Sequence, residues 1–197
     1  MHMPARIECF WDCVSSYTYI ASTRIERLAA ETGAELVWRP FLLGAVFQAT
    51  GNAPPAQVPA KGRYLFDDLR RWGAHLDIPV RMPRPFPTST LLAQRVACAA
   101  TDSAELAKAL CRRYWGLGED VADEAVVRAC IVEAGLDADA LIAAAGSDEV
   151  KQRLKDNTAE AVERGAFGAP SFFIGETLFW GCDRIELMRA ELQRAGA

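Results

Sequence analysis

The sequence predicts an α/β protein in which the two ends of the chain build one sheet and a long helical segment is inserted between them. Residues 7–40 have the pattern of a strand, a helix and a second strand, residues 61–164 carry helical periodicity, and residues 171–194 have the pattern of a hairpin followed by a helix. The predicted boundaries are 1–41 and 164–197 for the sheet-forming part and 42–163 for an all-helical insertion.

The first predicted strand ends in a junction that suits a thiolate. Its residues Ile7, Cys9, Phe10 and Trp11 are apolar or β-prone. Apolar residues then recur at helical spacing up to a stop signal, and they are Tyr17, Tyr19, Ile20, Ile25, Leu28 and Ala29, followed by Thr32-Gly33. Ser15 lies between strand and helix, where free N–H groups and the positive helix end favour negative charge. An isolated serine in such a place is more often a simple helix cap.

Residues 34–40 form the second predicted strand and complete a parallel, right-handed βαβ unit. Prolines at 54, 55 and 59 then predict a loop, which is a suitable place for substrate contacts. A second irregular stretch, residues 78–87, contains four prolines and is expected to lie against the first loop.

Most of the insertion is predicted to be helical. The predicted helices cover residues 63–75, 88–100, 103–115, 123–133 and 147–164, with breaks at Gly116, Gly118, Gly135 and Gly146. Their stripes of Ala, Leu and Val indicate core packing and not a cofactor site.

The C-terminal part begins with a helix stop at Gly165, and the dipeptide Ala169-Pro170 then opens a buried strand. Residues 171–174 and 178–180 are predicted to form a hairpin, and residues 183–194 a helix with Asp183 as its N-cap. Taken alone, Pro170 is a trans turn proline, because only about one X-Pro bond in twenty is cis.

Composition excludes several functions. The net charge of −4 and the absence of a basic cluster give no attraction for nucleic acid or an anionic membrane. No signal peptide, membrane span or metal-ligand spacing is recognisable, so we expect a cytoplasmic protein without a metal. The six cysteines include no Cys-x-x-Cys pair and are expected to be small buried hydrophobes.

The run FWDCVSSYTYIA resembles the N-terminal signature of the 2-hydroxychromene-2-carboxylate isomerases and the kappa-class glutathione transferases, which are DsbA-like members of the thioredoxin superfamily. Redox members of that superfamily carry Cys-x-x-Cys at this junction, whereas this chain has Ser15-Ser16-Tyr17-Thr18. Cys13 lies two residues too early to replace the first cysteine, and Ser16 stands where the family usually has proline. The motif therefore fits a protein that handles the thiol of another molecule.

The resemblance implies a thioredoxin-like domain of DsbA or kappa type in which Pro170 is cis and faces Ser15. It also implies glutathione as the thiol cofactor. The glutathione-binding residues are expected to be Ser15, Ala169, Pro170, Trp180, Gly181, Cys182 and Asp183. The backbone of Ala169 would pair with the cysteinyl part, and the N–H groups of Cys182 and Asp183 would hold the γ-glutamyl carboxylate. Cys182 replaces the asparagine of the family's closing Trp-Gly-Asn-Asp-Arg motif.

For the second substrate, the resemblance indicates Phe47, Asn52, Gln57 and Phe86. Some isomerases have at the position of Phe47 a lysine that meets the substrate carboxylate, so this chain departs from their pattern. Asn52 is alternatively a turn residue after Gly51. Arg81 and Arg84 are further candidates for the carboxylate, with solvated surface charge as the alternative.

The implied activity is the glutathione-dependent cis-trans isomerisation of an unsaturated aromatic acid, with Ser15 as the catalytic residue that favours the thiolate. Neither His2 nor His75 falls in a motif that would make Ser15 a nucleophile. Three alternatives remain: a kappa-like transferase that releases a conjugate, a DsbA-like oxidoreductase, which the missing cysteines oppose, and a binding protein without turnover. Family members are commonly homodimers, so a second copy is an expected partner.

Overall fold

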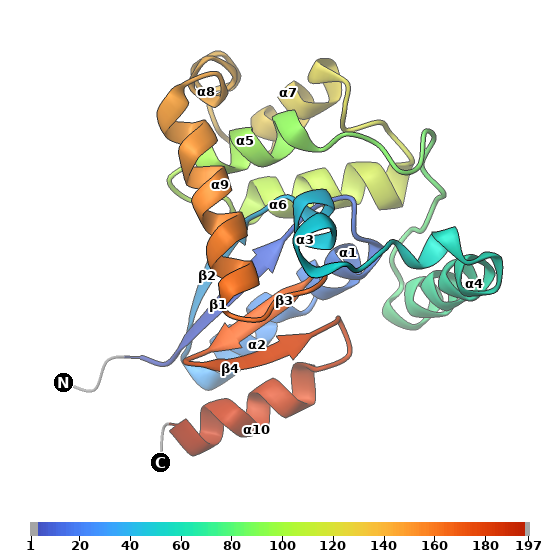
Figure 1. The fold of residues 1–197 in the computed structure, drawn as a ribbon, viewed down its shortest axis with the longest axis vertical. Helices are drawn as coiled ribbons and strands as arrows, with labels where there is room; N and C mark the ends of the chain where they lie inside the picture. The colour runs from blue at the N-terminus through green and yellow to red at the C-terminus, as the bar shows by residue number, and fades with distance from the viewer. Residues whose placement is uncertain (1–3, 196–197) are drawn as a thin grey trace.

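The protein is described here by a computed structural model of residues 4–195, in which the two ends of the chain build one mixed sheet (Figure 1). The strands are β1 (Arg6–Trp11), β2 (Glu35–Pro40), β3 (Ser171–Ile174) and β4 (Thr177–Trp180), in the order β2-β1-β3-β4. β1 pairs with β2 in parallel and with β3 antiparallel, and β3 and β4 form the hairpin. The predicted fold class is confirmed.

Helices fill the rest of the described chain. They are α1 (Ser16–Ser22), α2 (Ile25–Thr32), α3 (Leu43–Thr50), the 3-10 turn η1 (Pro55–Gln57), α4 (Pro59–Leu76), α5 (Leu91–Ala99), α6 (Ala104–Cys111), the π-helical turn η2 (Arg112–Leu117), α7 (Glu124–Glu133), α8 (Ala138–Ala145), α9 (Asp148–Glu163) and α10 (Ile185–Ala195). Figure 1 shows α5 to α8 grouped above the sheet, α9 running down in front of it, and α4 projecting from the molecule. Every described element between β2 and β3 is helical, as predicted.

The single helix predicted after the first strand is wrong, because α1 ends at Ser22 and α2 begins at Ile25. Hydroxyl groups explain the break: Ser22 donates to the carbonyl of Tyr19 and Thr23 to that of Ile20, both at 2.8 Å. Such local bonds compete with the helical ladder. The predicted stop is confirmed, since Gly33 adopts a left-handed conformation with φ of 67°.

Three further differences concern helix ends and short helices. The terminal helix begins at Ile185, so Asp183 lies before it and is not its N-cap. The prediction also missed α3 and α8. α8 is short and rich in alanine, and its start is fixed by the carboxylate of Asp137, which accepts the N–H of Ala140. An N-cap of this kind gives a helix start without an apolar stripe.

The irregular stretch at residues 78–87 is confirmed, with no regular structure until α5. Three hydrogen bonds hold its backbone to α1 and η2. The hydroxyl of Tyr19 in α1 donates to Pro79 O. In η2, Trp115 O accepts the N–H of Arg81, and the hydroxyl of Tyr114 donates to Pro85 O. Contact between this stretch and the first loop stays a prediction.

Both faces of the sheet are buried, and both cores include helices of the insertion. On one face Trp11 and Phe172 belong to a cluster that extends to Ala93 of α5 and Leu110 of α6. On the other face Phe10 packs with residues of α3 and α9. Because strand residues alternate between faces, the apolar run of β1 is buried on both sides. The carboxyl end of β1, where Ser15 follows, thereby lies inside the molecule.

Candidate active site

Ser15 lies at the N-cap of α1 and is almost fully buried, with 9% of its surface exposed. Its backbone is extended, and its hydroxyl oxygen accepts the N–H of Thr18 at 3.3 Å. The same hydroxyl donates to the carbonyl of Ala169 at 2.7 Å. Ser15 is therefore both a helix cap and a direct contact of the segment before β3.

The bond between Ala169 and Pro170 is cis, as the resemblance implied. The N–H of Gly181 donates to the carbonyl of Pro170 at 3.1 Å, and Ser171 lies opposite Trp180 in the hairpin. The structure thus brings the closing segment beside Ala169 and, through it, beside Ser15. This juxtaposition of three distant segments was predicted and is confirmed.

Two exposed aromatic rings lie next to this segment. Phe167 and Trp180 have ring centroids 4.9 Å apart, and 37% and 42% of their surfaces are exposed. Gly168 allows this arrangement, because a Cβ there would lie 2.5 Å from Nε1 of Trp180. Asn52 donates from Nδ2 to the carbonyl of Phe167 at 2.8 Å, so the first loop reaches the same place.

The turn after β4 has a conformation that requires glycine. Gly181 has φ of 106°, and a Cβ there would lie 2.9 Å from Oδ1 of Asp183. Asp183 forms an exposed ion pair with Arg184 at 2.7 Å. Arg24 donates to the carbonyl of Cys182 at 3.4 Å and lies over the ring of Trp72, so α2 and α4 also border the turn.

Neither cysteine near the site is suited to be a thiolate. Cys182 is 2% exposed, and burial followed by the charge of Asp183 raises the pKa of its thiol to about 12. Cys13 is fully buried, and burial followed by the charge of Asp12 raises its pKa well above the ordinary value. All six cysteines are free and buried. Neither thiol near Ser15 is therefore readily ionised near neutral pH.

Sequence reasoning missed Asp12, a buried carboxylate three residues before Ser15. It is 1% exposed, and it accepts the N–H of Val14 at 3.1 Å, the N–H of Leu43 at 2.9 Å and the hydroxyl of Thr90 at 3.1 Å. Burial raises its pKa to about 6 in spite of these donors. Asp12 thereby ties the turn before Ser15 to the start of α3 and to the segment before α5. An acidic residue inside an apolar run was the signal that could have found it.

The four residues indicated for the second substrate are not brought together as one group. Phe47 packs in the same cluster as Ala169, and Asn52 contacts Phe167. Phe86 packs edge-on against Trp115, whose Nε1 donates to the carbonyl of Cys13. Gln57 is exposed in η1, and among residues 4–195 no hydrogen bond links its side chain to the site. The substrate role of all four stays a prediction.

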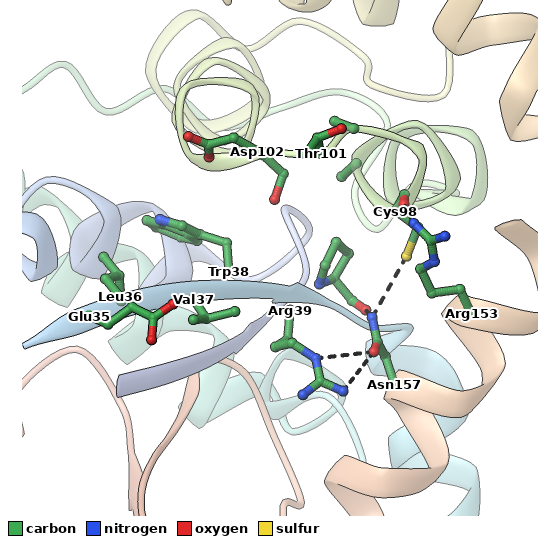
Figure 2. A pocket seen from close by; sticks show the side chains of 14 residues that line it. Glu35, Leu36, Val37, Trp38, Arg39, Cys98, Thr101, Asp102, Arg153 and Asn157 are labelled. Atoms are coloured by element: carbon green, nitrogen blue, oxygen red, sulfur yellow. Dashed lines mark hydrogen bonds between the residues drawn. The ribbon is translucent and has the colours of Figure 1, made fainter. Parts of the chain in front are cut away.

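Two cavities lie away from Ser15. One of about 350 Å³ follows β2 (Figure 2). The other, of about 230 Å³, lies between α4 and the irregular stretch, and its lining includes Trp115, Arg70 and Arg81.

The remaining charged residues considered in the sequence lie at the surface or outside the described part of the chain. Arg84 is exposed. Of the two histidines, His75 is exposed on α4 beside Trp72, and His2 lies outside the described residues.

The residues present fit a glutathione-like thiol. The N–H of Ala169 has no hydrogen-bond partner among residues 4–195, and its carbonyl accepts only from Ser15. A peptide-like ligand can therefore pair with this residue as a short extra strand. The N–H groups at the start of α1 complete a suitable donor set for an anionic sulfur.

A sheet of this topology, with a cis-proline facing the start of α1, defines a thioredoxin-like protein. The chain belongs to the DSBA-like thioredoxin domain family, whose model matches residues 6–193. It is 32% identical to 2-hydroxychromene-2-carboxylate isomerase of Sphingobium xenophagum, over 96% of this chain and 99% of that protein. It is 30% identical to glutathione S-transferase kappa 1 of Homo sapiens, over 94% of this chain and 90% of that protein.

The solved structures agree on the fold. A 2-hydroxychromene-2-carboxylate isomerase superimposes with a TM-score of 0.88 over 97% of this chain and 96% of that one, at 24% identity. The resemblance drawn from the N-terminal motif is confirmed. Within residues 4–195, no helix is long and apolar enough to cross a membrane, and no three His, Cys, Asp or Glu side chains are placed to hold a metal ion.

Proposed function

We propose that this protein is a glutathione-dependent cis-trans isomerase of an unsaturated aromatic acid, of the type that interconverts 2-hydroxychromene-2-carboxylate and trans-o-hydroxybenzylidenepyruvate. One observation carries the proposal: a serine, and not a cysteine, caps α1 opposite Ala169 and the cis-proline. A hydroxyl at this place can donate to a thiolate but cannot be oxidised to a disulfide. The match to an isomerase along nearly the whole of both chains supports the same activity.

In this proposal the backbone of Ala169 pairs with the cysteinyl part of glutathione, and the exposed rings of Phe167 and Trp180 border it. The N–H groups of Cys182 and Asp183 receive the γ-glutamyl carboxylate, and the carboxylate of Asp183 pairs with the ammonium group. Asp183 is exposed and, among residues 4–195, its one ion pair is with the adjacent Arg184, so it is accessible for this pairing. Because these donors belong to the backbone, the contact does not depend on the side chain at position 182, where the family has asparagine and this chain has Cys182.

Ser15 has one hydroxyl proton and therefore cannot donate to Ala169 and to a sulfur at the same time. The cysteinyl N–H of the ligand takes the place of the hydroxyl at the carbonyl of Ala169, and the hydroxyl turns to the sulfur. No polar group is left unpaired by this exchange. Together with the positive end of α1, the hydroxyl lowers the pKa of the bound thiol.

Bound glutathione supplies a thiolate that adds reversibly to the conjugated double bond and leaves after rotation about the resulting single bond. The protein's part is to hold the sulfur as an anion and to keep the acid in contact with it. Ser15 is the catalytic residue in this scheme as a hydrogen-bond donor, because no base lies within its hydrogen bonds to make it a nucleophile.

A kappa-like transferase is the second candidate, because the human kappa enzyme matches the chain almost as well. It would use the same cradle and release a conjugate. A DsbA-like oxidoreductase is opposed by Ser15 and by the buried Thr18 in place of the redox pair. Six unpaired, buried cysteines support a reducing compartment, and we propose the cytoplasm.

The test is a reaction of the purified protein with reduced glutathione and an unsaturated aromatic keto acid, followed by chromatography and mass spectrometry. The proposal expects the isomer as the product, with glutathione recovered unchanged and no turnover with S-methylglutathione. Accumulation of a stable adduct would favour the transferase. Isomerisation at the same rate without any thiol would contradict both.

A further inference from the structure

Thr18 carries a buried hydroxyl that has no hydrogen-bond partner among residues 4–195. The residue lies in the first turn of α1, three positions after Ser15, and only 1% of its surface is exposed. A buried hydroxyl without a partner lowers stability, because the hydrogen bonds that it made to water in the unfolded chain are lost. A partner that is present only in another state of the molecule would explain this group.

The carbonyls that a threonine hydroxyl commonly reaches are not used. In a helix such a hydroxyl can donate to the carbonyl three or four positions earlier, which here belongs to Ser15 or Val14. The carbonyl of Ser15 instead accepts the N–H groups of Thr18 and Tyr19, at 3.1 and 3.3 Å. Ser22, one turn later, does bond at this spacing, since its hydroxyl donates to the carbonyl of Tyr19 at 2.8 Å. The hydroxyl of Thr18 is therefore left for a different acceptor.

The hydroxyl oxygen of Ser15 is an acceptor within the same turn. It accepts the backbone N–H of Thr18 at 3.3 Å, and side chains three positions apart in a helix have Cβ atoms only about 5–6 Å apart. A hydroxyl oxygen has two lone pairs, and this N–H uses one of them. The second lone pair has no donor in the described part of the chain.

The proposed function requires this oxygen to move. In the free protein the hydroxyl of Ser15 donates to the carbonyl of Ala169 at 2.7 Å. Once the cysteinyl N–H of glutathione occupies that carbonyl, the two oxygens repel each other at this distance, because no proton lies between them. Ser15 must then turn about χ1 to another staggered position as its hydroxyl goes to the sulfur. This turn is the step at which Ser15 can gain a new neighbour.

We propose that, in the complex with glutathione, the hydroxyl of Thr18 donates a hydrogen bond to Oγ of Ser15 while Ser15 donates to the sulfur. The inference rests on the proposed function and adds a positioning residue to it. A hydroxyl that accepts a hydrogen bond is itself a stronger donor, because successive bonds polarise one another. Thr18 thus strengthens and directs the bond from Ser15 to the thiolate without touching the ligand.

The first test compares two buried threonines in the free protein. Thr18→Val replaces the hydroxyl by a methyl group at similar helix propensity, and it should leave the midpoint of urea unfolding unchanged or raise it, because no hydrogen bond is lost. Thr158→Val is the matched control. Thr158 is 8% exposed, donates to the carbonyl of Leu154 at 2.7 Å and accepts the N–H of Leu42 at 3.1 Å, so its loss should lower the midpoint. If both variants lowered the midpoint equally, the hydroxyl of Thr18 would already be paired in the free protein, and the proposal would fail.

The second test measures the thiol of bound glutathione by thiolate absorbance. Thr18→Val should raise the pKa of this thiol by about one unit relative to the wild type and should lower turnover at neutral pH about tenfold. Thr18→Ser keeps the hydroxyl and should restore both values, which a role in packing alone would not produce. A bound thiol with the same pKa in Thr18→Val and in the wild type would overturn the proposal.

A double variant shows whether Thr18 acts through Ser15. In Ser15→Ala the acceptor of the proposed bond is gone, so the further change Thr18→Val should not raise the pKa of the bound thiol again. A second rise of the same size would mean that Thr18 contacts the sulfur itself, which contradicts a positioning role. Failure of the proposed function is seen separately, because a wild type that does not bind glutathione, or binds it with an unaltered thiol pKa, would overturn that function together with this inference.

Discussion

Ser15 and Ala169 are 154 positions apart in the chain, and the hydroxyl of one donates to the carbonyl of the other at 2.7 Å. This bond joins the start of α1 to the segment that begins β3. The hydroxyl that caps α1 is thus the same hydroxyl that the proposed function directs to the sulfur of the ligand. The predictions below separate these roles.

Ser15→Ala should reduce turnover far more than stability. Loss of the cap should cost about 0.5–2 kcal/mol of the free energy of unfolding. Loss of one preorganised donor to the sulfur should lower kcat about a hundredfold to a thousandfold, and it should raise the pKa of the bound thiol, followed by thiolate absorbance. Ser16→Ala, one residue further on, is the control and should cost little. Full activity in Ser15→Ala would make Ser15 only a cap.

Gly168→Ala should damage the cradle through a single methyl group. Its Cβ would lie 2.5 Å from Nε1 of Trp180, so the ring or the strand start must move. We expect a loss of about 1–3 kcal/mol in the free energy of unfolding, measured by urea titration, and weaker glutathione binding by calorimetry. Gly44→Ala is the matched control, because nothing lies within 4 Å of a Cβ there. Equal losses of stability and of glutathione binding in the two variants would contradict this account of Gly168.

Asp12 should make stability depend on pH near neutrality. Its folded-state pKa is raised from 3.8 to about 6, so the stability it contributes is present below about pH 4 and is lost as the pH rises through about 6. Because Asp12 is only 1% exposed, this shift corresponds to a contribution on the order of 2–3 kcal/mol to the free energy of unfolding. Relative to Asp12→Asn, the wild type should lose stability between pH 4 and 7 in denaturant titrations. If the difference in the free energy of unfolding between the wild type and Asp12→Asn did not vary with pH, the pKa of Asp12 would not be raised by folding.

The cysteines should contribute nothing to catalysis. With a pKa raised to about 12, the thiol of Cys182 is ionised to about one part in 10⁵ at pH 7. Cys182→Ala should therefore retain turnover with glutathione, and the native protein should react slowly with a thiol reagent that titrates all six cysteines after unfolding. Rapid labelling of one cysteine in the native state, protected by glutathione, would reverse this conclusion.

Local signals in the sequence predicted the strands, the βαβ unit and the hairpin, because apolar strand patterns, a glycine stop and an X-Pro dipeptide are properties of neighbouring residues. The place of the third strand beside the first was implied by the family resemblance. The sequence by itself also determined that no redox pair stands at the helix start. Local signals failed where a contact from elsewhere decides the structure. The start of α3 is held by the carboxylate of Asp12, and the α1–α2 break depends on hydroxyls that could equally have faced water.

The neighbours of Ser15 and of the segment before β3 depend on the closed fold. Asn52 of the first loop meets Phe167, two residues before Ala169, whereas Gln57 is exposed in η1. The exclusion of Cys182 as a thiolate likewise rests on its burial, which composition suggested and only packing could establish. The physical reason is common to these cases: burial and hydrogen bonding between distant segments depend on the closed fold, whereas strand, helix and turn preferences are properties of neighbouring residues.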